Sequence, residues 1–345
     1  MSFLAAVVVV VGMTITAAGS AAPSLSWHLT PTGTTARLRG VSAVSSTVAW
    51  TSGSLGTVLR TVDQGATWQN VSPPGTSSLQ FRDIEAFDAK HAVILSIGNG
   101  TDSRIYVTAD GGQTWTLGFQ NADPDAFYDC MTFFNRNRGL ALSDPVGGKF
   151  RIIATEDGGY SWHLVSNANM PPALPGEAGF AASGECLVSF GGRFAWFGSG
   201  GAAEARVFRS QDGGQSWQVS STPMISGPSA GIFALAFNDP IHGIAVGGDF
   251  AAPSASPDAA AWTGDGGVNW QLADDAPSEY RSGATWLAGR TAIDVGPTGS
   301  DFTTDRGLTW HTFDTGSFDT VDCAHVGACW ASGEQGRAAY LVGRP

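Results

Sequence analysis

Nine side chains in this sequence are of types that could hold or cleave a ligand. Arginines bind carboxylates in bidentate fashion, tyrosine can act as a nucleophile, and paired carboxyl groups can work as acid and base. Most of these residues begin apolar, strand-like runs, and two of them end such runs. Arg39, Arg82, Asp83, Asp129, Glu185, Tyr280 and Arg281 stand at the starts, and Asp144 and Asp249 stand at the ends.

A short motif that recurs six times indicates how these residues are positioned. It reads Ser/Thr-x-Asp-x-Gly-x-Ser/Thr/Asn-Trp, and successive motif aspartates lie 40 to 55 residues apart. A period of about 40–50 residues with several short strands per unit is the signature of a β-propeller. The motif aspartates are Asp63, Asp110, Asp157, Asp212, Asp265 and Asp305.

Each copy of the motif lies between two strand-like runs, which predicts a tight hairpin turn. The Asp can accept N–H bonds within the turn, the Gly supplies a positive φ, and the Trp begins the next strand and buries its ring. The spacing lacks the alternating acidic ligands and distal Glu of a calcium loop. We therefore expect the motif aspartates to be structural, and we expect no metal and no cofactor.

Counting strands around the motif predicts an all-β, seven-bladed propeller. The segment Phe318–Gly343 supplies three strands, and Trp27 begins a strand-like run with the pattern of the other outer strands. We therefore expect the N-terminal strand to complete the seventh blade and close the ring, which removes open sheet edges. The first six blades are expected at Arg37–Ser72, Gln80–Phe119, Phe127–Val165, Glu185–Val219, Gly231–Leu272 and Tyr280–Phe313.

The motif is that of the Asp-box, or BNR, repeat, and with it the chain resembles the photosystem II stability/assembly factor family and its non-photosynthetic bacterial relatives. Many of those relatives are labelled glycosyl hydrolase or oxidoreductase. A more distant resemblance is to sialidases, which implies an arginine triad of Arg39, Arg82 and Arg281 around Tyr280. However, sialidases usually have six blades, and their Arg-Ile-Pro segment is replaced here by 37–40.

Composition limits the compartment and the partners. The net charge of −12, with only two lysines, argues against nucleic acid and anionic membranes as partners. Residues 1–22 read as an export signal peptide or an N-terminal anchor, and 23–345 as one propeller domain. Four cysteines fit an oxidising, extracytoplasmic compartment. We expect a Cys323–Cys329 bond across a hairpin, whereas a bond between Cys130 and Cys186 is the less favoured pairing.

Function is expected on one face of the ring. The longest insertions, Asn167–Gly184 and Ala251–Ala260, lie on the face opposite the motif turns, where loops on a rigid scaffold commonly bind ligands. We expect an exported, monomeric scaffold for binding or assembly that holds a protein, glycan or small molecule, with a sialidase-like glycoside hydrolase as the alternative. The binding residues would be Arg39, Arg82, Asp83, Asp129, Asp144, Asp249 and Arg281, and the alternative's catalytic residues would be Tyr280, Asp83 and Glu185.

Overall fold

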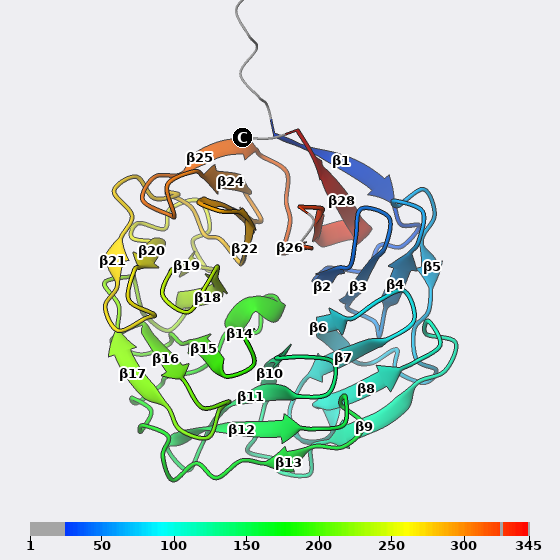
Figure 1. The fold of residues 1–345 in the computed structure, drawn as a ribbon, viewed down its shortest axis with the longest axis horizontal. Coiled ribbons are helices and arrows are strands. Elements are labelled where there is room, and N and C mark those ends of the chain that lie inside the picture. The colour runs from blue at the N-terminus through cyan, green and yellow to red at the C-terminus, as the bar shows by residue number, and fades with distance from the viewer. Residues whose placement is uncertain (1–24, 325–326, 344–345) are drawn as a thin grey trace, which may run out of the picture.

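The computed structural model describes residues 25–324 and 327–343, and within them it forms a ring of seven antiparallel, four-stranded sheets (Figure 1). The predicted seven-bladed propeller is confirmed. The predicted leader, 1–22, lies outside the described residues. Among the residues that are described, no helix is long and apolar enough to cross a membrane.

Blades 1 to 6 each run outward from an inner strand to an outer one in chain order, and in blade 7 the N-terminal strand is the outermost. Blades 1 to 3 are β2 (Leu38–Ala43), β3 (Ala49–Gly53), β4 (Val58–Thr61), β5 (Gln69–Asn70); β6 (Gln80–Ala86), β7 (Ala92–Ile97), β8 (Arg104–Thr108), β9 (Thr116–Gln120); and β10 (Tyr128–Phe133), β11 (Gly139–Val146), β12 (Lys149–Thr155), β13 (His163–Leu164). Blades 4 to 6 are β14 (Leu187–Phe190), β15 (Phe194–Gly198), β16 (Arg206–Ser210), β17 (Gln218–Ser221); β18 (Ala230–Phe237), β19 (Gly243–Asp249), β20 (Ala260–Thr263), β21 (Gln271–Leu272); and β22 (Gly283–Ala288), β23 (Thr291–Gly296), β24 (Gly299–Thr303), β25 (His311–Asp314). Blade 7 is β26 (Thr320–Cys323), β27 (Cys329–Ser332), β28 (Arg337–Val342) and β1 (Ser26–Pro31).

The N-terminal strand closes the ring, as the sequence predicts. Strand β1 pairs with β28 along its whole length, and Trp27 lies opposite Leu341. The Trp27 ring packs against Phe318 at 5.3 Å between ring centroids, and its Nε1 donates to Ser300 Oγ at 3.0 Å. The first strand therefore ties the last blade to blade 6.

The six repeated motifs form one kind of turn between the third and fourth strands of blades 1 to 6. In the second copy Asp110 accepts the Thr114 N–H at 2.9 Å and the Thr114 hydroxyl at 2.6 Å, and Thr108 donates a further hydroxyl bond at 2.9 Å. These bonds lower the pKa of Asp110 to about 2. The carboxylate thus accepts hydrogen bonds from turn groups that have no neighbouring strand to pair with.

The apolar core lies between neighbouring blades. For example, Phe150, Phe197 and Phe208 of blades 3 and 4 form one buried cluster. The same two blades are joined by a disulfide between Cys130 and Cys186, so the pairing that the sequence favours less also forms. The predicted Cys323–Cys329 bond is present across the β26–β27 hairpin.

Because every blade is antiparallel, the loops divide between two faces. We call the face with the motif turns the motif face. The other face carries the starts of the inner strands, the ends of the second strands and both long insertions, and we call it the insertion face.

In the described part of the chain three short 3₁₀ helices interrupt the loops: η1 (Gly100–Asp102), η2 (Gly184–Cys186) and η3 (Glu334–Gly336). Of these, η2 contacts the inner strands of five blades and lies by the centre of the ring (Figure 1). It therefore helps to shape the central channel.

Candidate functional site

The inner strands carry a β-bulge at the same place in blades 1, 2, 3 and 5. The register with the second strand shifts around one residue of each inner strand, which is Arg39, Arg82, Asp129 or Phe233. A bulge adds one unpaired residue and turns its side chain away from the regular pleat. In each of these four blades the bulge residue therefore lies at the insertion-face end of the channel. We call this end of the channel the mouth.

Blades 4 and 6 carry a residue at the corresponding position along the chain. Glu185 precedes Cys186 as Asp129 precedes Cys130, and the disulfide aligns the two positions. In blade 6 the Arg281 N–H donates to Gly247 O of the preceding blade, as the Leu38 N–H donates to Gly333 O. Arg281 therefore occupies the place of buried Leu38, and Ser282 corresponds to Arg39.

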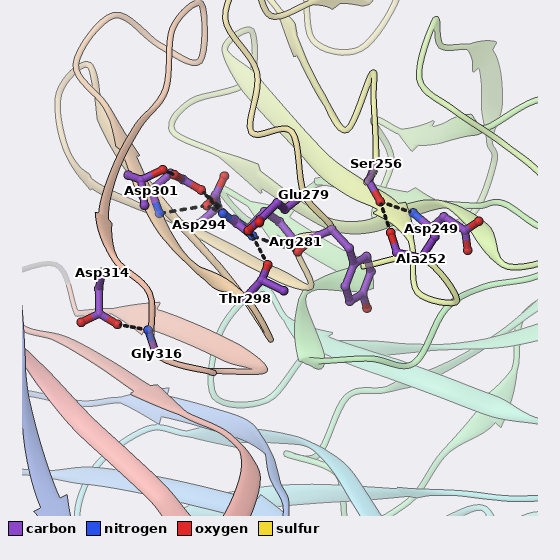
Figure 2. A network of polar contacts seen from close by, with 12 residues as sticks. Asp249, Ala252, Ser256, Glu279, Arg281, Asp294, Thr298, Asp301, Asp314 and Gly316 are labelled. Atoms are coloured by element: carbon purple, nitrogen blue, oxygen red, sulfur yellow. Dashed lines mark hydrogen bonds and ion pairs between the residues drawn. The ribbon is translucent and has the colours of Figure 1, made fainter. Parts of the chain in front are cut away.

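This shift of one residue explains why Arg281 does not join the mouth. Its side chain is 2% exposed and lies inside blade 6, where it pairs with Asp301 at 2.6 Å and Asp294 at 3.2 Å (Figure 2). These carboxylates outweigh the effect of burial and raise the pKa of Arg281. The arginine triad implied by the sialidase resemblance is thus not formed, because successive residues of a strand point to opposite sides.

Two arginines at the mouth have no carboxylate partner in the described part of the chain. Arg39 makes no hydrogen bond or ion pair there, and Arg82 donates only to the carbonyl of Ala181. By contrast, Arg37 is held by Asp319 at 2.6 and 2.8 Å. Burial and the neighbouring charges of Arg39 and Arg37 lower the pKa of Arg82 to about 9. The mouth therefore holds two guanidinium groups that no carboxylate of the described residues contacts directly, with Asp319 acting on both from further away.

Tyr280 lies at the same mouth. It is 6% exposed, and burial followed by Asp319 raises its pKa, while Arg39, Arg37 and Arg82 act in the opposite direction. A nucleophilic tyrosine needs a lowered pKa or an adjacent base. The environment of Tyr280 therefore favours a neutral phenol that packs against Phe233.

Aromatic side chains that the sequence analysis did not single out adjoin the arginines. Phe180, from the first insertion, stacks on Phe233 with ring centroids 4.3 Å apart, and Phe233 meets Tyr280 edge-on at 4.7 Å. Phe250 contacts both phenylalanines edge-on and is 51% exposed. We call these four residues the aromatic group. The signal that could have found it is the place of Phe233, which matches that of Arg39 and Arg82 in the repeats.

A third feature of the insertion face is a pair of carboxyl groups. Asp129 is 1% exposed and its Oδ2 has no partner among the described residues, while Asp144 accepts the Gly179 N–H at 2.8 Å. Burial and then Asp144 raise the pKa of Asp129, while Arg82 acts in the opposite direction; burial raises the pKa of Asp144 to about 6. Asp144 also lines a cavity of about 600 Å³ between blades 2, 3 and 4.

Asp249 stands apart from this pair. Its side chain accepts the Ala251 N–H at 2.9 Å, and its own backbone N–H donates to the Ser256 hydroxyl oxygen at 2.9 Å. Figure 2 shows this loop beside, but separate from, the Arg281 network. The structure thus gives Asp249 a role in holding the second insertion.

The end of the first insertion lies across the top of the channel. Gly184 faces the Asp83 carboxylate, the Ser183 hydroxyl donates to Ser282 O at 2.7 Å, and Glu185 accepts the Thr320 hydroxyl at 2.7 Å. These contacts join three blades to the segment 183–185, so Asp83 and Glu185 lie below the mouth instead of on it.

Below this segment, the channel forms a cavity of about 950 Å³ that is lined by the inner strands down to the motif face. Its wall includes Asp83, Glu85, Glu185 and Asp322. Burial raises the pKa of Asp83 to about 7 and that of Glu185 to about 8. Within the described ranges, no group of His, Cys, Asp or Glu has an arrangement that could hold a metal ion.

Of the residues singled out from the sequence, the structure brings Arg39, Arg82, Asp129 and Tyr280 together at the mouth. Asp144 and Asp249 lie further out on the same face, Asp83 and Glu185 line the channel below, and Arg281 is inside blade 6.

Comparison with known proteins supports the fold. No protein-family model matches the chain, and no curated protein matches it. A structure of YCF48 bound to a D1 peptide is similar, with a TM-score of 0.67 and 15% identity over 93% of this chain and 99% of that one. The structure of YCF48 from Cyanidioschyzon merolae has a TM-score of 0.63 and 14% sequence identity, over 91% of this chain and 98% of that one. A GH74 enzyme from Niastella koreensis has a TM-score of 0.63 and 12% sequence identity, over 90% of this chain but only 53% of the enzyme. The chain therefore shares its propeller fold with a peptide-binding protein and with glycoside hydrolases.

Proposed function

We propose that this protein is an exported Asp-box propeller that binds a segment of a partner protein at the mouth, through a carboxylate held by Arg39 and Arg82. The observation that carries the proposal is the pair of partly buried guanidinium groups without a carboxylate partner in the described structure. A planar guanidinium matches a carboxylate in bidentate geometry. Bringing a carboxylate to this site would satisfy donors that are already partly removed from water.

The surroundings favour a peptide over a polyanion. The net charge of −12 repels nucleic acid, so the positive charge of the mouth is local. The aromatic group offers apolar surface beside the arginines, and apolar and aromatic side chains with a few well-placed polar groups are typical of ligand-binding sites. The similar fold of YCF48 in its complex with a D1 peptide gives this reading a structural precedent. The two disulfides fit an oxidising compartment outside the cytoplasm, to which residues 1–22 would direct the chain.

The test is carboxylate-dependent peptide binding. Fluorescent tetrapeptide pools with a free C-terminal carboxylate are compared with the same pools in amidated form, using anisotropy at low salt. Because a charge-assisted hydrogen bond contributes about 1.5–3 kcal/mol, Arg82→Gln or Arg39→Gln should weaken binding at least tenfold. The matched control is Arg290→Gln, which removes the same charge from an exposed hairpin on the motif face. Equal binding of acid and amide pools would refute the proposal.

A glycoside hydrolase is the second candidate, and the carboxyl pair Asp129 and Asp144 is the observation that favours it. Both carboxyl groups have a raised pKa, and a protonated carboxyl beside an ionised one is the arrangement of a glycosidic acid and base. A screen with fluorogenic glycosides tests it. Turnover that is lost in Asp144→Asn, but kept in Asp249→Asn, would establish hydrolysis and displace the binding function.

A further inference from the structure

The aromatic group is continuous with the arginines of the mouth. Arg82 donates to the carbonyl of Ala181, which stands in the chain between Phe180 and Ala182, and both of these neighbours pack in the cluster with Phe233 and Tyr280. The residue that Arg82 contacts is therefore a direct chain neighbour of the aromatic cluster, since consecutive Cα atoms are only about 3.8 Å apart.

One member of this group is left open to solvent. Phe180, Phe233 and Tyr280 support each other and are at least partly buried, whereas Phe250 is 51% exposed and its ring rests edge-on against two of them. A ring held at this angle loses little freedom when a ligand covers it. An apolar side chain placed there would cover this ring, and the favourable free energy of binding would grow with the apolar area buried.

We propose that the aromatic group selects a large apolar side chain on the C-terminal residue of the bound segment. This inference rests on the proposed function, because the carboxylate at Arg39 and Arg82 sets where that side chain falls. The ligand class is thus a protein or peptide tail that ends in a residue such as Leu or Phe, with its terminal carboxylate free.

A fatty acid shares this chemistry, since it also joins a carboxylate to apolar carbon. A long acyl chain would need an enclosed tunnel that continues from the carboxylate site. Neither the cavity beside Asp144 nor the cavity below the mouth is lined by a member of the aromatic group. The open, single-ring surface of Phe250 therefore fits one side chain of a peptide.

The experiment measures affinities of acetyl-Gly-Gly-Ser-X peptides, where X is Leu, Phe, Ala or Gly, each as the free acid and the amide, together with laurate. The wild-type protein should bind the Leu and Phe acids about tenfold more tightly than the Ala and Gly acids. Phe250→Ala should remove this preference, so that the Leu and Phe acids bind no more tightly than the Ala and Gly acids. Ile241→Ala is the matched control, since Ile241 is 49% exposed but stands between β18 and β19 on the motif face.

The outcomes separate the two proposals. Equal affinity for all four free acids would overturn the apolar preference and leave the carboxylate-binding function standing. Equal affinity of acids and amides would overturn the proposed function, and with it the placement of the apolar side chain at the C-terminal residue. Tighter binding of laurate than of any peptide would assign the site to fatty acids and overturn the inference.

Discussion

The closing strand offers the most direct test of how the ring is held together. Trp27 lies on the first strand of the described chain, yet its ring is 9% exposed and packs on Phe318 and Phe313. Replacing Trp27 with Ala should cost about 3–5 kcal/mol of unfolding free energy, the usual range for a large aromatic side chain removed from a core.

A second substitution separates the contribution of the hydrogen bond from that of the packed ring. Trp27→Phe keeps most of the ring but loses the hydrogen bond from Nε1 to the fully buried Ser300 hydroxyl. It should therefore cost about 1–3 kcal/mol, because a buried group is left without its partner. Leu29→Ala is the control on the same strand, since Leu29 is 52% exposed and its loss should stay within about 0.5 kcal/mol.

The measurement is equilibrium urea unfolding followed by far-ultraviolet circular dichroism. If β1 closes the ring, the loss should follow the order Trp27→Ala, Trp27→Phe, Leu29→Ala. A Trp27→Ala protein no less stable than Leu29→Ala would refute the reasoning, because it would mean that the N-terminal strand adds no packing to blade 7.

Other predictions concern buried charges and covalent links. The pKa of Glu185 is raised to about 8 in the folded chain, so the stability that Glu185 contributes is fully present below about pH 4.5 and is lost as the pH rises to about 8. Glu185→Gln removes this titrating group. The urea midpoint of the variant should therefore fall less between pH 5 and pH 8.5 than that of the wild type. Arg281→Ala should cost about 3–5 kcal/mol in urea unfolding, since it leaves Asp294 and Asp301 buried without a counter-charge, and a fully stable variant would contradict this pairing. Loss of the Cys130–Cys186 bond, which spans 56 residues, should cost about 4 kcal/mol, against about 2 for the six-residue Cys323–Cys329 bond; equal losses by the same assay would count against loop entropy as the source.

The sequence by itself determined the architecture because the repeat encodes it locally. Each motif aspartate bonds to groups within four residues, so the turn forms wherever the motif stands. The unmatched strand at Trp27 and the three strands of the last segment could be paired by counting alone. The hairpin disulfide was predictable for the same reason, since Cys323 and Cys329 face each other across one turn.

Only the tertiary structure decided which side chains meet at the mouth. A residue at the start of an inner strand can point into the channel or into the blade, and a shift of one position exchanges the two. Thus Arg39 and Arg82, on bulges, reach the mouth, whereas Arg281 takes the place of a buried leucine and finds its carboxylates inside blade 6. The aromatic group joins Phe180 of the first insertion and Phe233 of β18 to Phe250, which follows β19, and to Tyr280, which precedes β22. No local pattern brings these four together.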